Sequence, residues 1–216
     1  MRRKYILFVI MLFTVILSAC EEENTAELMY DHLEEAVQIE QDVSDKQGPL
    51  TEAEQNEHQW YEEMLALSDE EEIQELSEQA IQSAKERREL MNEEKEIIDN
   101  AYEEFQLSSE YVEQLDEELM PLAEEMIETM EARYSIYQDL YNEYIETIEL
   151  DIELYELIAQ EELTVEELHE QHDLVNEAYE EINTLNEQFN EKTVQYNDEK
   201  RAFYEAADLN VVFEDM

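Results

Sequence analysis

The sequence has 216 residues and a formal charge of −50, because 62 acidic residues stand against 12 basic ones. A chain this acidic repels the phosphate backbone, which excludes nucleic acid as a partner. It has one glycine and two prolines, too few for the tight turns of a sheet protein or an α/β enzyme. The predicted fold class is therefore all-α.

Residues 1–19 have the pattern of a signal peptide. Three basic residues within positions 2–4 precede an almost unbroken apolar run over residues 5–17. Thirteen residues are too few to cross a hydrocarbon core, which takes about 20. A charged start followed by a short apolar segment is typical of secretion signals instead.

The signal peptide ends in a segment that resembles the lipobox of bacterial lipoproteins, Leu17-Ser18-Ala19-Cys20. Small residues before the cysteine fit a narrow protease site, and the thiol of Cys20 can accept a diacylglycerol. We predict cleavage between Ala19 and Cys20 and a lipid anchor on Cys20, the single cysteine of the chain. Two acyl chains anchor a protein firmly, so the predicted location is the outer face of the cell membrane. The alternative is an ordinary secretion signal with a chance cysteine.

The mature chain begins with a short tether over residues 20–24, and a helical bundle is predicted over residues 25–208, with a tail at 209–216. A first apolar stripe runs from about residue 25 to 47, and we expect Gly48-Pro49 to interrupt it. Thr51 to Glu54 reads as a capping box that restarts the helix.

Three further helical stretches follow. Ser68-Asp69-Glu70-Glu71 predicts a helix start, and Leu107-Ser108-Ser109 a break. In the stretch from about 109 to 160, Pro121 is expected either to kink the helix or to mark the first turn of a new one. The segment 163–168 combines a capping box with a hydrophobic staple. Beyond it an apolar residue recurs every seven positions, which predicts a seam between near-parallel helices: Leu168, Val175, Ile182, Phe189, Tyr196 and Phe203.

These stripes predict an elongated antiparallel up-and-down helical bundle with short connections. Four long helices result if residues 25–66 form one bent element and the chain turns back at Ser68. Three long helices plus a short first one result if the chain runs straight through Ser68. Four helices is the preferred arrangement.

One motif suggests metal chemistry. Glu166-x-x-His169 matches the Glu-x-x-His element of di-iron bundles, which need two such motifs and two further inward glutamates. No second motif surrounds the other three histidines, and glutamate is frequent enough for one match among four histidines by chance. We therefore expect no metal site and no cofactor, and we assign no catalytic or ligand-binding residues.

Two other groups of residues are weighed as binding surfaces. A row of tyrosines suits sugar stacking or a protein partner, but its spacing favours rings packed in a helix seam with hydroxyls at the edge: Tyr134, Tyr137, Tyr141, Tyr144 and Tyr155. The bases of the mature chain are surrounded by acids. We therefore expect these bases to form ion pairs within the bundle rather than a basic docking patch. They are Lys85, Arg87, Arg88, Lys95, Lys192, Lys200 and Arg201.

The chain also resembles a known family. The resemblance runs from Leu17 to about Ala207 and rests, besides the lipobox, on scattered positions: Ala26-Glu27-x-Met29-Tyr30, Arg88 with Glu94-Lys95, Arg133-Tyr134, Leu154-Tyr155, Asn176, Phe189-Asn190 and Tyr196-Asn197. These are similar to the cell-wall-binding lipoproteins of the YkyA type from Gram-positive bacteria. The resemblance implies an up-and-down helical bundle and affinity for the wall, and it carries over no catalytic or ligand residues.

The expected function is that of a non-enzymatic, lipid-anchored protein of the cell envelope that binds a wall polymer or an envelope protein. The alternative is an enzyme on a helical bundle, either a metal-dependent ferritin-like oxidase or a wall hydrolase with paired carboxylates. Residues 20–216 hold all 62 acids and nine of the bases, a formal charge of −53. Charge attraction to anionic wall polymers is therefore not the expected mechanism.

Overall fold

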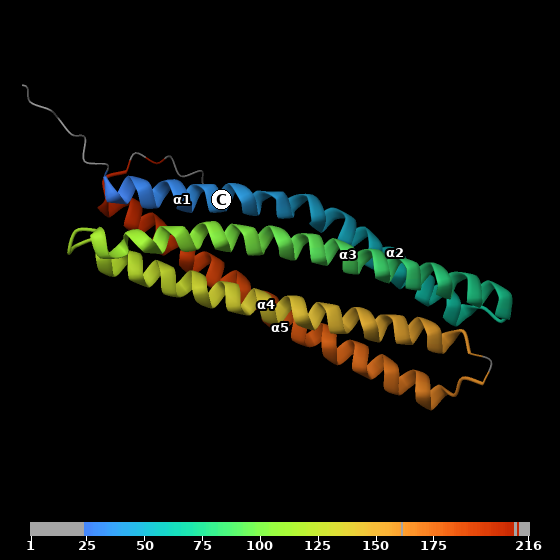
Figure 1. Ribbon diagram of the computed structural model, residues 1–216. Helices are drawn as coiled ribbons and strands as arrows, with labels where there is room; N and C mark the ends of the chain where they lie inside the picture. Colours follow the sequence, from blue (N-terminus) through green and yellow to red (C-terminus); the bar gives the residue numbers. More distant parts are fainter. Residues whose placement is uncertain (1–23, 161, 210, 212–216) are drawn as a thin grey trace, which may run out of the picture.

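A computed structural model describes residues 24–160, 162–209 and 211; the predicted signal peptide and Cys20 lie outside these residues. Within them the chain is helical and contains no strand, which confirms the all-α class. Figure 1 shows an elongated bundle. Its α-helices are α1 (Thr25–Glu40), α2 (Ser44–Ala66), α3 (Glu70–Ser108), α4 (Met120–Ile158) and α5 (Val165–Ala206), with 3₁₀ segments η1 (Gln41–Val43) and η2 (Ser109–Gln114).

The first two helices form one bent element, because η1 joins α1 to α2 without leaving helical backbone angles. The predicted interruption at Gly48-Pro49 is wrong, since Pro49 lies inside α2. The predicted capping box is wrong as well: the Thr51 hydroxyl donates to the Gln47 carbonyl, 2.9 Å away, within the continuous helix. A proline removes one backbone hydrogen bond, but the helix continues through Pro49, and Leu50 and Met64 are buried along it.

The other helix ends follow the sequence signals. The Asp69 carboxylate caps α3 by accepting two backbone N–H bonds, α3 ends at Ser108, and Pro121 lies in the first turn of α4. At the start of α5, the side chains of Thr164 and Glu167 each accept a hydrogen bond from the other's backbone amide. The chain turns back between α2 and α3, which confirms the preferred four-helix arrangement.

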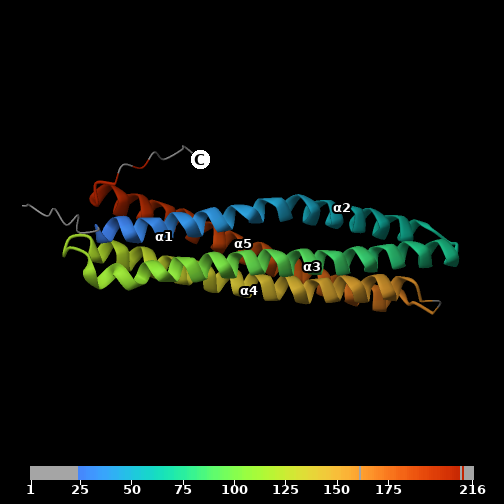
Figure 2. The same cartoon turned by 45° about the horizontal axis from the view of Figure 1, so that its top comes forward.

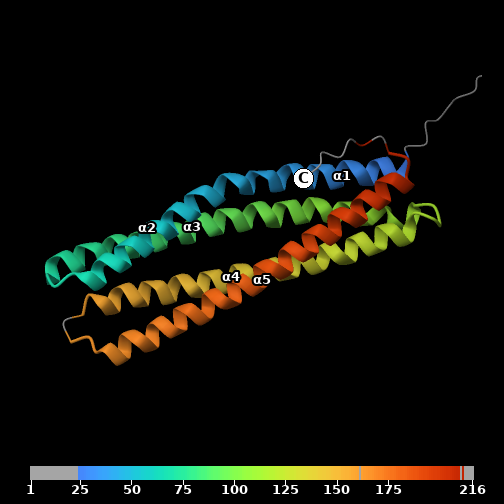
Figure 3. The ribbon, with the colours of Figure 1, turned by 180° about the vertical axis from the view of Figure 1, so that it is seen from behind.

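The helices pack mainly against their neighbours in sequence. Figure 2 shows α1 and α2 lying along α3, and α4 and α5 form the most extensive pair. Figure 3 shows α5 crossing the bundle to end beside α1. The predicted seam on α5 is confirmed by the burial of Val175, Ile182, Tyr196 and Phe203.

The hydrophobic core has two clusters along the bundle axis. The first contains Met29, Phe105 and Phe203, at the end where α1 begins and α5 ends. The second contains Met64, Ile148 and other residues toward the α2–α3 and α4–α5 connections. A helix of 39 residues, such as α3, is about 58 Å long at 1.5 Å per residue. Among the described residues, no helix combines the length and apolarity needed to span a membrane.

Candidate binding site

The metal motif of the sequence is not part of a cluster. His169 lies on the exposed side of α5, with its Nε2 atom 3.6 Å from a carboxylate oxygen of Asp173 on the same helix. In the described ranges, no group of three or more His, Cys, Asp or Glu side chains is arranged to hold a metal ion.

The tyrosine row packs between helices, as its spacing predicted. Tyr137 and Tyr155 are buried and the other three are half-buried. Each hydroxyl donates a hydrogen bond across the seam to a residue of α2 or α3: Tyr134 to Asp99, Tyr137 to Glu94, Tyr141 to Asn92, Tyr144 to Glu54 and Tyr155 to Glu57. The row therefore holds α4 against its neighbours.

The basic residues form ion pairs within the bundle. Within the described residues, at least six of the nine bases of the mature chain pair with carboxylates: Lys46, Arg87, Arg88, Lys95, Arg133 and Lys200. The prediction is confirmed for Arg87, Arg88, Lys95 and Lys200, and these side chains do not form a basic patch.

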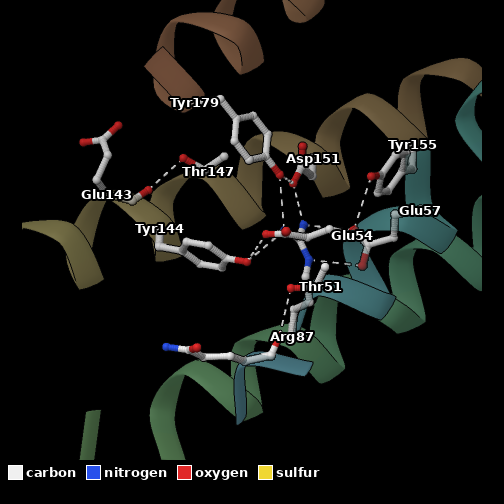
Figure 4. Close-up of polar contacts among 11 residues, drawn as sticks. Thr51, Glu54, Glu57, Arg87, Glu143, Tyr144, Thr147, Asp151, Tyr155 and Tyr179 are labelled. Atoms are coloured by element: carbon white, nitrogen blue, oxygen red, sulfur yellow. Dashed lines mark hydrogen bonds and ion pairs between the residues drawn. The ribbon is translucent and has the colours of Figure 1, made fainter. Parts of the chain in front are cut away.

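Arg87 is the centre of a buried network that joins all four long helices (Figure 4). Its side chain is 1% exposed. The Nε atom donates to Glu57 Oε1 at 3.1 Å, and Nη2 donates to Asp151 Oδ2 at 2.5 Å. The Nη1 atom donates to the hydroxyls of Tyr179, at 3.2 Å, and Tyr144, at 3.4 Å. With Glu54 and Tyr155, these residues are called the Arg87 network.

Helical spacing brings the network together. Glu54 and Glu57 are three residues apart on α2, so they share one face. On α4, Tyr144, Asp151 and Tyr155 follow the same stripe as the apolar core. Arg87 likewise continues the stripe of α3.

Burial controls the charges of the network. It raises the pKa of Glu57 and of Asp151, because the ionised carboxylates are desolvated, while the charge of Arg87 acts in the opposite direction. Burial by itself lowers the pKa of Arg87, because the guanidinium is desolvated. The net pKa is nevertheless raised by the surrounding oxygens, which belong to Tyr179, Glu57, Tyr144 and Asp151. Arg87 therefore stays cationic and attracts both carboxylates.

A cavity of about 320 Å³ adjoins the Arg87 network between α2, α4 and α5. On its outer side the rings of Tyr61 and His172 stack with centroids 6.1 Å apart, which connects α2 to α5. We call this cavity the acidic pocket; it is lined by Glu54, Glu57, His58, Tyr61, Asp151, Leu154, Tyr155, His172, Val175, Asn176 and Tyr179.

A second cavity of about 380 Å³ lies between α1, α3, α4 and α5 and has aromatic walls, including Phe105 and Tyr196. The buried Arg133 side chain lines it, pairs with Glu40 and donates to the Thr193 hydroxyl at 2.8 Å. Arg133-Tyr134 and Tyr196-Asn197, which the sequence resemblance singled out, line this cavity.

The comparisons with known proteins agree with the sequence resemblance. Residues 24–206 match the sequence model of the YkyA family, described as "Putative cell-wall binding lipoprotein". The chain belongs to this family. It is 31% identical over 202 residues to the uncharacterized lipoprotein YkyA of Bacillus subtilis (strain 168), with 91% of this chain and 90% of that protein covered.

A solved structure has the same fold. It is the 1.6 Å crystal structure of a conserved protein of unknown function from Staphylococcus aureus. The TM-score is 0.58 at 11% sequence identity, and the match covers 86% of this chain and 98% of the other. At this identity the likeness concerns the fold alone.

Proposed function

We propose that this YkyA-family chain is a non-enzymatic lipoprotein of the cell envelope, held on the outer face of the membrane by a lipid on Cys20. The lipobox and the family support the anchor. Helix α1 then begins at Thr25, five positions after Cys20, and the bundle serves as the binding domain.

The distribution of charge carries the proposal about what the bundle binds. Its acids far outnumber its bases, and six of the bases are engaged in ion pairs with those acids. Anionic polymers such as teichoic acids are repelled by such a surface over a Debye length of about 8–10 Å. The bundle therefore binds neutral or cationic groups of the wall.

A structural role for the buried ionisable groups supports binding over catalysis. Glu57 and Asp151 both pair with Arg87, and tyrosine hydroxyls donate to the same carboxylates. Groups engaged in this way hold helices together. The enzyme alternative is tested by assaying wall hydrolysis in the binding experiment below.

Lipid-free protein starting at Glu21 can be mixed with purified walls, with or without teichoic acid, in magnesium or in EDTA. All four helices and both core clusters lie within the described residues, so this form retains the bundle. We expect weak binding in EDTA at low salt and stronger binding once teichoic acid is removed, because removal relieves charge repulsion. Strong retention in EDTA that disappears with the teichoic acid, or release of soluble wall fragments, would contradict the proposal.

A further inference from the structure

We propose that the acidic pocket binds a primary ammonium group. The inference rests on the proposed function, because it names the group of the wall that the bundle recognises. Four observations carry it: a charge imbalance, a carboxylate oxygen without a hydrogen-bond donor, aromatic walls and the size of the pocket.

The charge imbalance concerns the carboxylates at the pocket. Glu57 and Asp151 have side chains only 1% and 5% exposed, and a single guanidinium, that of Arg87, faces both. Glu54, 38% exposed, adds a third carboxylate beside Arg87. Buried charge without a counter-charge is costly. A second cation in the pocket would offset the excess negative charge.

The free acceptor belongs to Asp151. Its Oδ2 atom accepts from Arg87 Nη2 at 2.5 Å and from the Tyr179 hydroxyl at 2.9 Å. Figure 4 shows its other oxygen turned away from the guanidinium. Within the part of the chain that the structure describes, both donors to Asp151 go to Oδ2 and none to Oδ1, and Asp151 lines the pocket with 3% of the residue exposed. An accessible carboxylate oxygen in a largely buried side chain can accept from an N–H donor, and an ammonium group carries three.

The aromatic residues suit the same ligand. Tyr61, Tyr155 and Tyr179 line the pocket, and ring faces attract cations electrostatically. The Tyr179 hydroxyl donates to Asp151 and accepts from Arg87. The Tyr155 hydroxyl donates to Glu57, and its oxygen remains as an acceptor. The walls thus offer acceptors and ring faces to a cation.

The size of the pocket restricts the ligand to a small group. A volume of about 320 Å³ is at the lower end for small-molecule sites, about 300–1,000 Å³. The pocket therefore takes the end of a side chain rather than the backbone of a polymer. Free amines of wall peptides and amino-acid esters on wall polymers both present a primary ammonium at the end of a short chain.

Calorimetric titration of the protein starting at Glu21 with n-butylammonium tests the pocket directly. The comparison ligands are 1-butanol, which lacks the charge, and tetramethylammonium, which lacks N–H donors. We expect saturation at one site by n-butylammonium, weaker binding of tetramethylammonium and no saturable binding of 1-butanol. Equal affinity for 1-butanol, or no saturable binding of n-butylammonium, overturns the site.

Paired variants separate the pocket from the general acidity of the surface. Glu54→Gln removes a carboxylate at the pocket, and Glu62→Gln removes an exposed one two turns later on α2. We expect Glu54→Gln to weaken n-butylammonium binding about tenfold, as loss of one nearby charge at intermediate dielectric implies, and Glu62→Gln less than about twofold. Equal losses would mean non-specific attraction and overturn the site. Tyr61→Leu leaves every carboxylate in place and should also weaken n-butylammonium binding. It replaces Glu54→Gln in this test if that variant does not fold.

Walls with acetylated amines identify the source of the ammonium group. If acetylation abolishes binding to walls that lack teichoic acid, a wall peptide supplies the amine. If only walls that carry teichoic acid bind, and acetylation abolishes that binding, the polymer ester supplies the amine, and the proposed repulsion from teichoic acid is overturned. Wall binding that persists after acetylation overturns the amine as the recognised group and leaves the proposed function standing. Absence of wall binding, together with tight n-butylammonium binding, overturns the proposed function and leaves the pocket standing.

Discussion

Replacing Arg87 with methionine is expected to destabilise the bundle by about 3–5 kcal/mol, the usual cost of removing one partner from a buried ion pair. The substitution leaves Glu57 and Asp151 buried without their shared cation. It also removes two hydrogen bonds to the hydroxyls of Tyr144 and Tyr179. Urea unfolding followed by circular dichroism measures the change in the free energy of unfolding.

The neighbouring residue is the matched control. Arg88 is 29% exposed and pairs with Glu149, which is exposed at the surface. Exposed ion pairs contribute about 0–1 kcal/mol, and this pair is open to water on the side of Glu149, 56% exposed. Arg88→Met should therefore cost clearly less stability than Arg87→Met. Equal effects of the two substitutions would contradict the structural role of the Arg87 network.

The Arg87→Met variant should also recover stability as the pH falls. Burial raises the pKa of Glu57 and Asp151, and loss of the guanidinium raises it further. In the window between the unfolded and native pKa, the native state then holds more protons than the unfolded state, so stability falls as pH rises. The difference in unfolding free energy between Arg87→Met and Arg88→Met should therefore shrink between pH 8 and pH 5. If this difference grew as the pH fell, the unpaired buried carboxylates of Glu57 and Asp151 could not be the cause of the lost stability.

Cys20→Ala is expected to abolish lipid attachment completely, because the thiol is the acceptor of the diacylglycerol and Cys20 is the single cysteine. The precursor should stay uncleaved or be shed into the medium. Metabolic labelling with an alkyne fatty acid, followed by fractionation of cells and medium, measures both effects. Lipid labelling and membrane retention equal to the parent chain would rule out the anchor.

Ser18→Ala is the control for this experiment. It changes a residue of the lipobox to another small one and leaves the thiol in place. We expect labelling and cleavage close to those of the parent chain. A loss equal to that of Cys20→Ala would mean that export of the precursor, rather than lipid attachment, had failed.

Most of the fold follows from local signals in the sequence. Thr164 with Glu167, Asp69 and Pro121 each mark a helix start through interactions within one turn, so they are readable without tertiary structure. The predicted helix break at Pro49 was wrong because the free-energy cost of a proline is local, whereas the burial that stabilises α2 comes from contacts with other helices. The bent element Thr25–Ala66 is thus the part that depends most on packing.

The candidate site was predictable only in part. Ion pairing of Arg87 was expected, but its partners lie 30, 57, 64 and 92 residues away. The sequence does not select these two carboxylates and two tyrosines from 62 acids and 13 tyrosines. One signal was available: Arg87 follows Ala80 and Ala84 and precedes Met91 at core spacing. A charged residue inside an apolar stripe indicates a buried polar network. Arg133 between Met130 and Tyr137 has the same signature.

The most direct test of wall recognition by the bundle is photo-crosslinking in intact cells. A photoreactive residue is placed in the full chain at His58, which lines the acidic pocket and is 72% exposed, or at Glu62, which is 69% exposed one turn later on the same helix. After irradiation the wall is digested and the protein is analysed for attached wall fragments. We predict wall fragments on the protein that carries the probe at position 58 and few or none at position 62. Equal labelling at the two positions, or no wall fragments at either, would contradict recognition of the wall through the acidic pocket.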